Sequence, residues 1–182
     1  EKRLAFAYGR ALVLSRIAYF VIAFALVGAL FAIAPNFPAL EAALVLGVLA
    51  ITALLFVVSP LLTEHWLTRS RLILRQGWYF RAVLPLSGIV SLTAADESMP
   101  LRAPLGIHRS LGQPTLYVTG GRTGLIVVRL GEPRRFWSSF GLEATELVFD
   151  VEDREGFLRA YEERRGLLPP VQADRADADL RD

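Results

Sequence analysis

Residues 64–80 read EHWLTRSRLILRQGWYF, and one residue separates them from an apolar run, ALLFVVSPLL, at 53–62. In the first stretch Leu72 and Leu74 share one face of an extended chain, while Arg71, Ile73 and Arg75 share the other. Alternation of this kind predicts a β-strand with one largely wet face. A sheet domain therefore begins where an apolar helix ends.

Charge divides the 182-residue chain into two parts. Residues 11–62 contain only Arg16 and Glu41 as charged side chains, whereas residues 63–182 contain 16 Arg and 16 acidic residues. The apolar part predicts a membrane protein. The chain has no cysteine, which excludes disulfides, thiolate metal sites and cysteine nucleophiles.

Two apolar spans predict a transmembrane helical hairpin within residues 1–62. Residues 17–34 form an uncharged run of about 27 Å at about 1.5 Å per residue, and Arg16 can extend its guanidinium toward the headgroups. Two prolines in the turn at 35–38 stop the first helix. The predicted helices are about 11–34 and 39–62.

The first span could instead be a cleaved signal peptide, because Ala32-Ile33-Ala34 resembles a cleavage site. Pro35 directly after it disfavours cleavage, and a second apolar span follows at once. We therefore expect a retained hairpin in the inner (plasma) membrane. Basic residues flank both ends of the hairpin and are absent from its turn, which predicts that both termini are cytoplasmic.

Small residues on both spans predict close helix packing where Gly28 and Gly47 reach similar depth. The general abundance of glycine and alanine in membrane helices explains the same residues equally well.

Beyond Thr63 the pattern predicts an α+β domain over residues 63–166. The expected strands are Arg71–Arg75, Trp78–Leu86, Ile89–Leu92, Leu116–Thr119, Leu125–Leu130 and, more weakly, Arg135–Ser138 and Leu147–Val151. We expect a long loop at 94–114, and a hairpin in which Gly120-Gly121 turns the fourth of these strands into the fifth.

A helix should follow Asp153 as its N-cap and end near Arg165. Residues 167–182 have too little apolar content to pack and should be disordered. The simplest architecture is a small curved antiparallel sheet or barrel capped by the C-terminal helix.

The order of hairpin, basic strand pair and closing helix resembles bacterial membrane-flanked proteins with a pleckstrin-homology-like (PH-like) domain. Three short motifs over residues 1–166 carry the resemblance, with Trp66 where tyrosine is usual and the last motif one residue shorter. The matching residues are Leu67, Thr68, Arg71, Leu72, Ile73, Arg75 and Gly77, then Leu84, Pro85, Leu86 and Ile89, and finally Asp153, Glu155 and Phe157. The resemblance implies a PH-like fold and a tethered scaffolding or partner-binding role.

No pattern of reactive residues predicts an enzyme. The two histidines, His65 and His108, are 43 residues apart, and no nucleophile, phosphate-loop, dinucleotide or zinc-protease motif occurs. We expect no catalytic, metal or cofactor site and no nucleic-acid partner.

The remaining signal is electrostatic. Residues 63–135 contain 10 Arg and 4 acidic residues, whereas 136–182 contain 6 Arg and 12 acidic residues. The candidate membrane-interface or lipid-headgroup residues are Trp66, Arg69, Arg71, Arg75, Trp78 and Arg81, and the candidate partner-binding loop residues are Arg102, His108 and Arg109. The positive-inside rule alone accounts for the arginine cluster, and we favour it over specific lipid recognition.

The sequence thus predicts an integral membrane protein with a non-catalytic interaction or scaffold module. A role as an accessory subunit of a membrane complex is a closely related expectation. The expected partners of the protein are the bilayer and other membrane proteins. The alternative is a module that binds anionic lipid headgroups.

Overall fold

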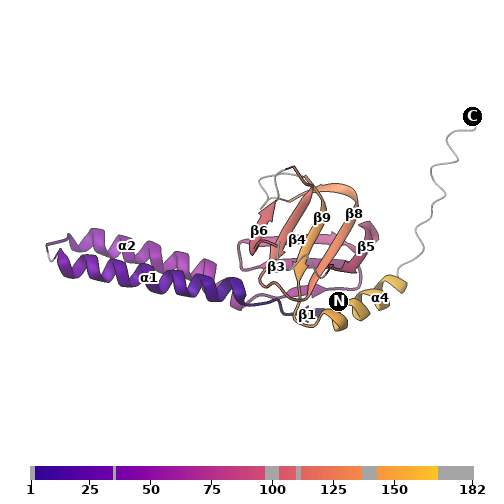
Figure 1. The fold of residues 1–182 in the computed structure, drawn as a ribbon, viewed down its shortest axis with the longest axis horizontal. Coiled ribbons are helices and arrows are strands. Elements are labelled where there is room, and N and C mark those ends of the chain that lie inside the picture. Colours follow the sequence, from indigo (N-terminus) through magenta and orange to yellow (C-terminus); the bar gives the residue numbers. More distant parts are fainter. Residues whose placement is uncertain (1–2, 35, 97–102, 110–111, 137–142, 168–182) are drawn as a thin grey trace, which may run out of the picture.

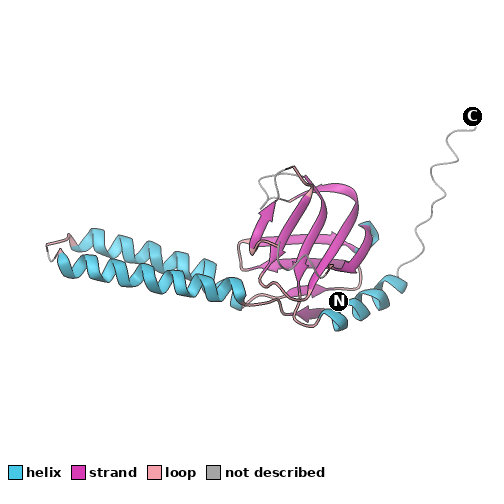
Figure 2. Cartoon of the chain, in the orientation of Figure 1, coloured by secondary structure: helices cyan, strands magenta, loops and turns pink. Residues whose placement is uncertain are grey.

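A computed structural model describes residues 3–34, 36–96, 103–109, 112–136 and 143–167. A long helical hairpin projects from one end of a compact β-domain, and a short C-terminal helix lies along another side of that domain (Figures 1 and 2). The α+β class expected from the sequence is confirmed.

The hairpin consists of α1 (Ala11–Ile33) and a second apolar helix that changes its winding near its end. The second helix comprises α2 (Ala39–Ala53), a π-helical turn η1 (Leu54–Val58) and α3 (Ser59–Leu61). Both helices are 23 residues long, with mean hydropathies of 2.3 and 2.7, and most of their side chains are exposed. They are long and apolar enough to cross a membrane.

The helices do not approach closely at their glycines. A Cβ atom placed on Gly28 or Gly47 would meet nothing within 4 Å. The expected tight packing at this depth is therefore wrong. The helices instead contact nearer the β-domain, where Val13 and Phe20 of α1 pack against Val57 of η1.

Nine described strands form two sheets. Their bounds are β1 Leu4–Phe6, β2 His65–Leu67, β3 Arg71–Gln76, β4 Phe80–Pro85, β5 Ile89–Ala94, β6 Gly106–Arg109, β7 Thr115–Thr119, β8 Leu125–Arg135 and β9 Glu143–Asp150. The first sheet has the order β1-β2-β3-β4 and the second the order β5-β8-β9-β7-β6. Among the described strands no hydrogen-bonded ladder joins the two sheets, so they do not form a closed barrel.

The strand β1 is new relative to the sequence-based expectation. Its residues precede the hairpin, yet Leu4 pairs with Leu67 and Phe6 with His65. The main-chain N–H of Glu152 also donates to Ala7 O at 2.8 Å. The segment before α1 is thus built into the β-domain.

Two expectations for the second sheet are wrong. The predicted loop at 94–114 contains β6, which pairs with β7, while residues 97–102 and 110–111 lie outside the described residues. β7 and β8 do not form a hairpin, because β9 lies between them and pairs in parallel with β7. The residues Leu147, Val148 and Phe149 of β9 are fully buried, which suits a central strand.

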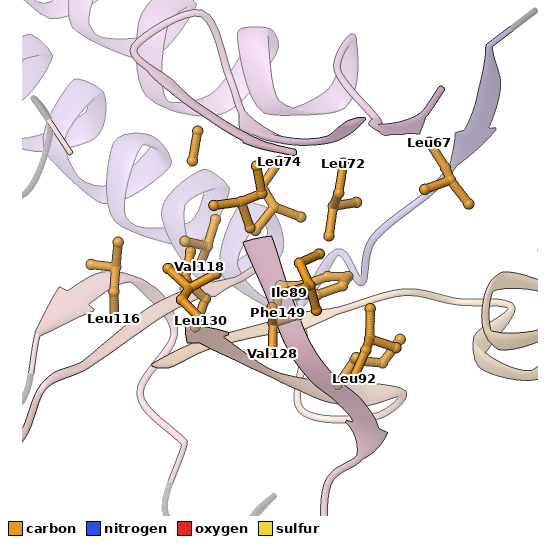
Figure 3. Packing of buried hydrophobic residues seen from close by; sticks show 14 of the residues in the cluster. Leu67, Leu72, Leu74, Ile89, Leu92, Leu116, Val118, Val128, Leu130 and Phe149 are labelled. Atoms are coloured by element: carbon orange, nitrogen blue, oxygen red, sulfur yellow. The ribbon is translucent and has the colours of Figure 1, made fainter. Parts of the chain in front are cut away.

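One apolar core joins both sheets. Figure 3 shows its side chains converging, including Leu72 and Leu74 from the first sheet and Val128 and Phe149 from the second. Full burial of so many aliphatic side chains provides the main drive for folding.

The helix α4 (Arg154–Gly166) closes the core with Phe157 and Tyr161, both 0% exposed. Asp153 caps it by accepting a hydrogen bond from Gly156 N at 2.9 Å, as expected from the sequence. Of the expected disordered tail, residues 168–182 lie outside the described residues. So do residues 137–138 of the weakly predicted strand that starts at Arg135, and Arg135 itself ends β8.

Candidate functional site

The hairpin is joined to the β-domain through Arg16. Pro60 lacks an N–H group and cannot donate to Phe56 O, four residues earlier in the helix. The Arg16 guanidinium donates to that carbonyl at 2.9 Å and to the Tyr79 hydroxyl at 2.8 Å. It also lies near the rings of Phe56 and Tyr79, at 5.4 and 5.8 Å from their centroids. Arg16 is therefore bound to protein groups at the junction.

Hydroxyl groups fix the end of the second helix to the turn between β3 and β4. Ser59 Oγ accepts a hydrogen bond from Trp78 N at 3.1 Å, and Thr63 Oγ1 accepts one from Gly77 N at 2.9 Å. The Tyr8 hydroxyl lies 2.8 Å from Thr63 Oγ1 and donates to Pro60 O at 2.7 Å. This turn is thereby held at the level where the helix ends.

A buried carboxylate anchors the segment before α1. Asp150 accepts hydrogen bonds from Gly9 N and Gly120 N, both at 2.6 Å, and is 0% exposed. Burial raises its pKa to about 6, against the opposing effect of these backbone donors. A Cβ on Gly9 would come within 2.7 Å of Gly121 Cα, so glycine is needed for this close approach.

His65 is buried against β9, where its ring packs edge-on against Phe149 with centroids 5.4 Å apart. Its ring stacks on Tyr8 with centroids 5.0 Å apart, and its Nδ1 accepts a hydrogen bond from Arg75 N at 3.1 Å. Burial lowers the pKa of His65 to about 3, only partly opposed by the Asp150 main chain. The imidazole is therefore neutral and serves as an acceptor within the fold.

A groove with basic and aromatic walls opens beside the junction. Its volume is about 340 Å³, and it is lined by Trp66, Arg75, Gly77, Trp78, Phe80 and Arg81. We call it the basic–aromatic groove. Arg75 and Arg81 are register partners on β3 and β4, so the two arginine side chains leave the same face of the sheet.

The two tryptophans of this groove differ in their surroundings. The Trp66 ring lies under two guanidinium groups, those of Arg75 at 4.4 Å and Arg3 at 5.1 Å from the ring centroid. Trp78 is 54% exposed, although its main chain is tied to Ser59 at the helix end. An exposed indole at this level suits a membrane–water interface.

A second hollow of about 430 Å³ adjoins the groove and shares Arg81 with it. Its lining residues are Arg81, Ala82, Val83, Pro133, Arg134, Arg135 and Phe136. We call it the seam, because it lies between β4 of the first sheet and the end of β8 of the second. Arg135 forms an ion pair with Glu143 at 3.0 Å.

The structure brings four of the six predicted interface residues together in the groove, namely Trp66, Arg75, Trp78 and Arg81. Arg69 and Arg71 do not line it. Arg71 starts β3 at the strand end away from the helix junction, about 13 Å along the chain from Arg75.

Two of the predicted partner-loop residues, His108 and Arg109, lie on a strand. His108 is exposed on β6, Arg109 is half-buried on the same strand, and Arg102 lies outside the described residues. Sequence reasoning missed Arg134 and Arg135, which lie more than 50 positions beyond Arg81 and reach it only through the pairing of β5 with β8.

Among the described residues, no group of three or more His, Asp or Glu side chains is placed to hold a metal ion. The groove and seam instead present guanidinium groups, aromatic rings and a strand edge. Such groups bind anions and extended chains and supply no nucleophile or general base.

Searches against protein-family models, curated proteins and solved structures found no match to this chain.

Proposed function

We propose that this chain is an integral membrane protein that holds a non-catalytic interaction module at the cytoplasmic face of the inner membrane. The two apolar helices support two membrane crossings, with both flanking segments on one side. The pairing of β1 with β2 supports the same topology, because these strands flank the hairpin and must meet in one compartment. The PH-like resemblance agrees with a small sheet domain closed by a helix.

The ligand that the geometry supports best is the anionic headgroup of a lipid. The observation that carries this proposal is the basic–aromatic groove, which is lined by Arg75 and Arg81 together with an exposed Trp78 at the helix end. Guanidinium groups bind phosphate oxygens through paired hydrogen bonds, and indole rings prefer the headgroup layer. The sequence alone favours the positive-inside rule as the explanation of the arginine cluster. The groove gives a reason to favour lipid recognition instead.

A matched pair of double variants tests the lipid site. The full chain is purified from membranes of mixed lipid, and the anionic fraction of the retained lipid is measured by mass spectrometry. R75Q/R81Q should lose most of the anionic preference, because it empties the groove of charge. R69Q/R71Q removes the same charge from the strand end away from the groove and should retain the preference.

If both double variants lose the same share of retained anionic lipid, a general attraction of basic residues to an acidic surface explains the preference, and the lipid site would be rejected. Raised salt should weaken the retention in the parent chain, since exposed charges are screened within about 8–10 Å at physiological ionic strength.

The role as an accessory subunit of a membrane complex stays a prediction. The hairpin leaves its apolar surface largely exposed, including the open space beside Gly28. Crosslinking of the hairpin to neighbouring proteins in intact membranes is the measurement that tests this role.

A further inference from the structure

The strand β4 is an edge of the first sheet, and its outward main-chain groups can be assigned. Leu86 N donates to Ser70 O at 2.9 Å, which continues the β3–β4 ladder by one pair. Hydrogen-bonded pairs alternate along an antiparallel ladder. The main-chain groups of Leu84 and Ala82 therefore face β3, and those of Arg81 and Val83 point away from it.

These outward groups have no partner strand. Within the described residues β4 pairs only with β3, and no hydrogen bond joins the main chain of Arg81 or Val83 to another residue. Pro85 also faces outward but has no N–H group, so it ends the available edge. Among the described residues, two N–H and two C=O groups thus have no partner, and they lie beside a hollow of about 430 Å³.

The opposite wall of the seam is also incomplete. The ladder between β5 and β8 ends at Ile89↔Leu130, and β8 continues to Arg135 without β5 beside it. The residues Pro133, Arg134 and Arg135 of this extension line the hollow. Among the described strands, the seam is therefore one place where the two sheets are not joined by a ladder.

We propose that the β4 edge at the seam binds an extended acidic segment of another protein by strand addition. The main-chain groups of Arg81 and Val83 would pair with the segment, as in other cases where a peptide extends a sheet. Acidic side chains would meet the guanidinium groups of Arg81 and Arg134. Alternate side chains of a strand point to opposite faces, so apolar residues between them would face Ala82 and Phe136 on the other wall of the hollow.

Charge argues against a second copy of this chain as the occupant. Two β4 edges placed together would bring the Arg81 side chains into one ladder, and like charges across a ladder destabilise it. Charge complementarity therefore selects an acidic segment from a different protein.

This inference rests on the proposed interaction role but not on the lipid site. Although Arg81 borders both hollows, Arg134 lines only the seam, and Arg75 only the groove. A variant at Arg134 should leave the anionic lipid preference unchanged, so failure of either proposal can be recognised separately.

The test uses the full chain in nanodiscs of zwitterionic lipid and a fluorescent synthetic peptide of alternating Glu and Val. V83P removes one outward N–H group at an edge position where proline is tolerated, and R134E reverses one charge. Each should weaken peptide binding at least about tenfold. The control R122E alters an exposed arginine in the connection between β7 and β8 and should bind within about twofold of the parent. Bound peptide should also slow hydrogen exchange at the Arg81 and Val83 amides.

Unchanged binding by V83P and R134E would overturn the proposal, as would equal binding of a peptide of alternating Lys and Val. If V83P does not fold, peptide binding by R134E and the hydrogen-exchange measurement on the parent chain test the proposal. The chain contains four Asp residues at 174–182, so a form ending at Gly166 is tested in parallel. Binding that appears only after this truncation would assign the edge to the chain's own tail and reject a separate partner.

Discussion

The buried histidine illustrates how a single residue links folding to pH. Because burial lowers the pKa of His65 to about 3, the folded state keeps it neutral below the pH at which an unfolded histidine protonates, about 6.5. Its contribution to stability is therefore present above pH 6.5 and is lost as the pH falls toward 3. Asp150 acts in the opposite direction, because its raised pKa gives a contribution that is present below about 3.8 and lost as the pH rises through about 6.

We predict that H65F flattens the acid side of the stability curve. Phenylalanine keeps the ring contacts with Tyr8 and Phe149 but cannot protonate. From pH 7 to pH 5 the parent should lose about 2 kcal/mol relative to H65F. Unfolding by denaturant in detergent at both pH values measures the difference. The pH dependence of stability that Asp150 contributes is common to both chains and cancels in the comparison. Parallel pH curves for the two chains would contradict a buried neutral His65.

Among the elements, β1 offers the most direct test of how packing stabilises the domain. It is three residues long, and its half-buried Phe6 packs edge-on against Phe157 of α4 with ring centroids 5.0 Å apart. We expect F6A to destabilise the domain by about 2 kcal/mol, below the 3–5 kcal/mol typical of fully buried phenylalanine. A5S, which changes an exposed position on the same strand, is the control.

Thermal unfolding of the full chain in detergent compares these two variants with the parent. If F6A and A5S unfold at the same temperature as the parent, β1 contributes no packing energy, and its place in the sheet is incidental.

Local signals explain which elements the sequence predicts. The apolar spans, the alternation in β3 and the cap at Asp153 are properties of neighbouring residues, and each of these elements is present. By contrast, β1 is three residues long and pairs with β2 far along the chain, and β6 is only four residues long, too short to show a clear alternation. The parallel pairing of β7 with β9 depends on the same distant contacts.

The same distinction applies to the candidate site. Trp66, Arg75, Trp78 and Arg81 come from one continuous stretch, and the β3–β4 register brings them together. Arg134 reaches the seam only because the second sheet folds beside the first, so its role could not be predicted from neighbouring residues. Arg69 and Arg71 of the predicted cluster do not line the groove, since Arg71 lies at the end of β3 away from the helix junction.

For the whole molecule, the central prediction is the side of the membrane on which the domain lies. The chain has no cysteine, so N36C and S87C each introduce a single label site, the first in the hairpin turn and the second in an exposed part of the domain. An impermeant thiol reagent added to intact cells or spheroplasts should label N36C at once. It should label S87C only after the membrane is opened. The reverse pattern would place the domain on the far side and reject the proposed topology.

The pairing of β1 with β2 also has a consequence for biosynthesis. The hairpin occupies the position that a connecting turn occupies in an ordinary β-hairpin, so nearly 60 residues separate the paired strands. In the proposed membrane topology, the first strand leaves the ribosome before either helix can enter the bilayer, and it stays unpaired until β2 has been translated. An unpaired strand is prone to false association. Because β1 is only three residues long, that hazard during translation is limited. In the proposed topology the domain completes its fold after the hairpin has been translated and inserted.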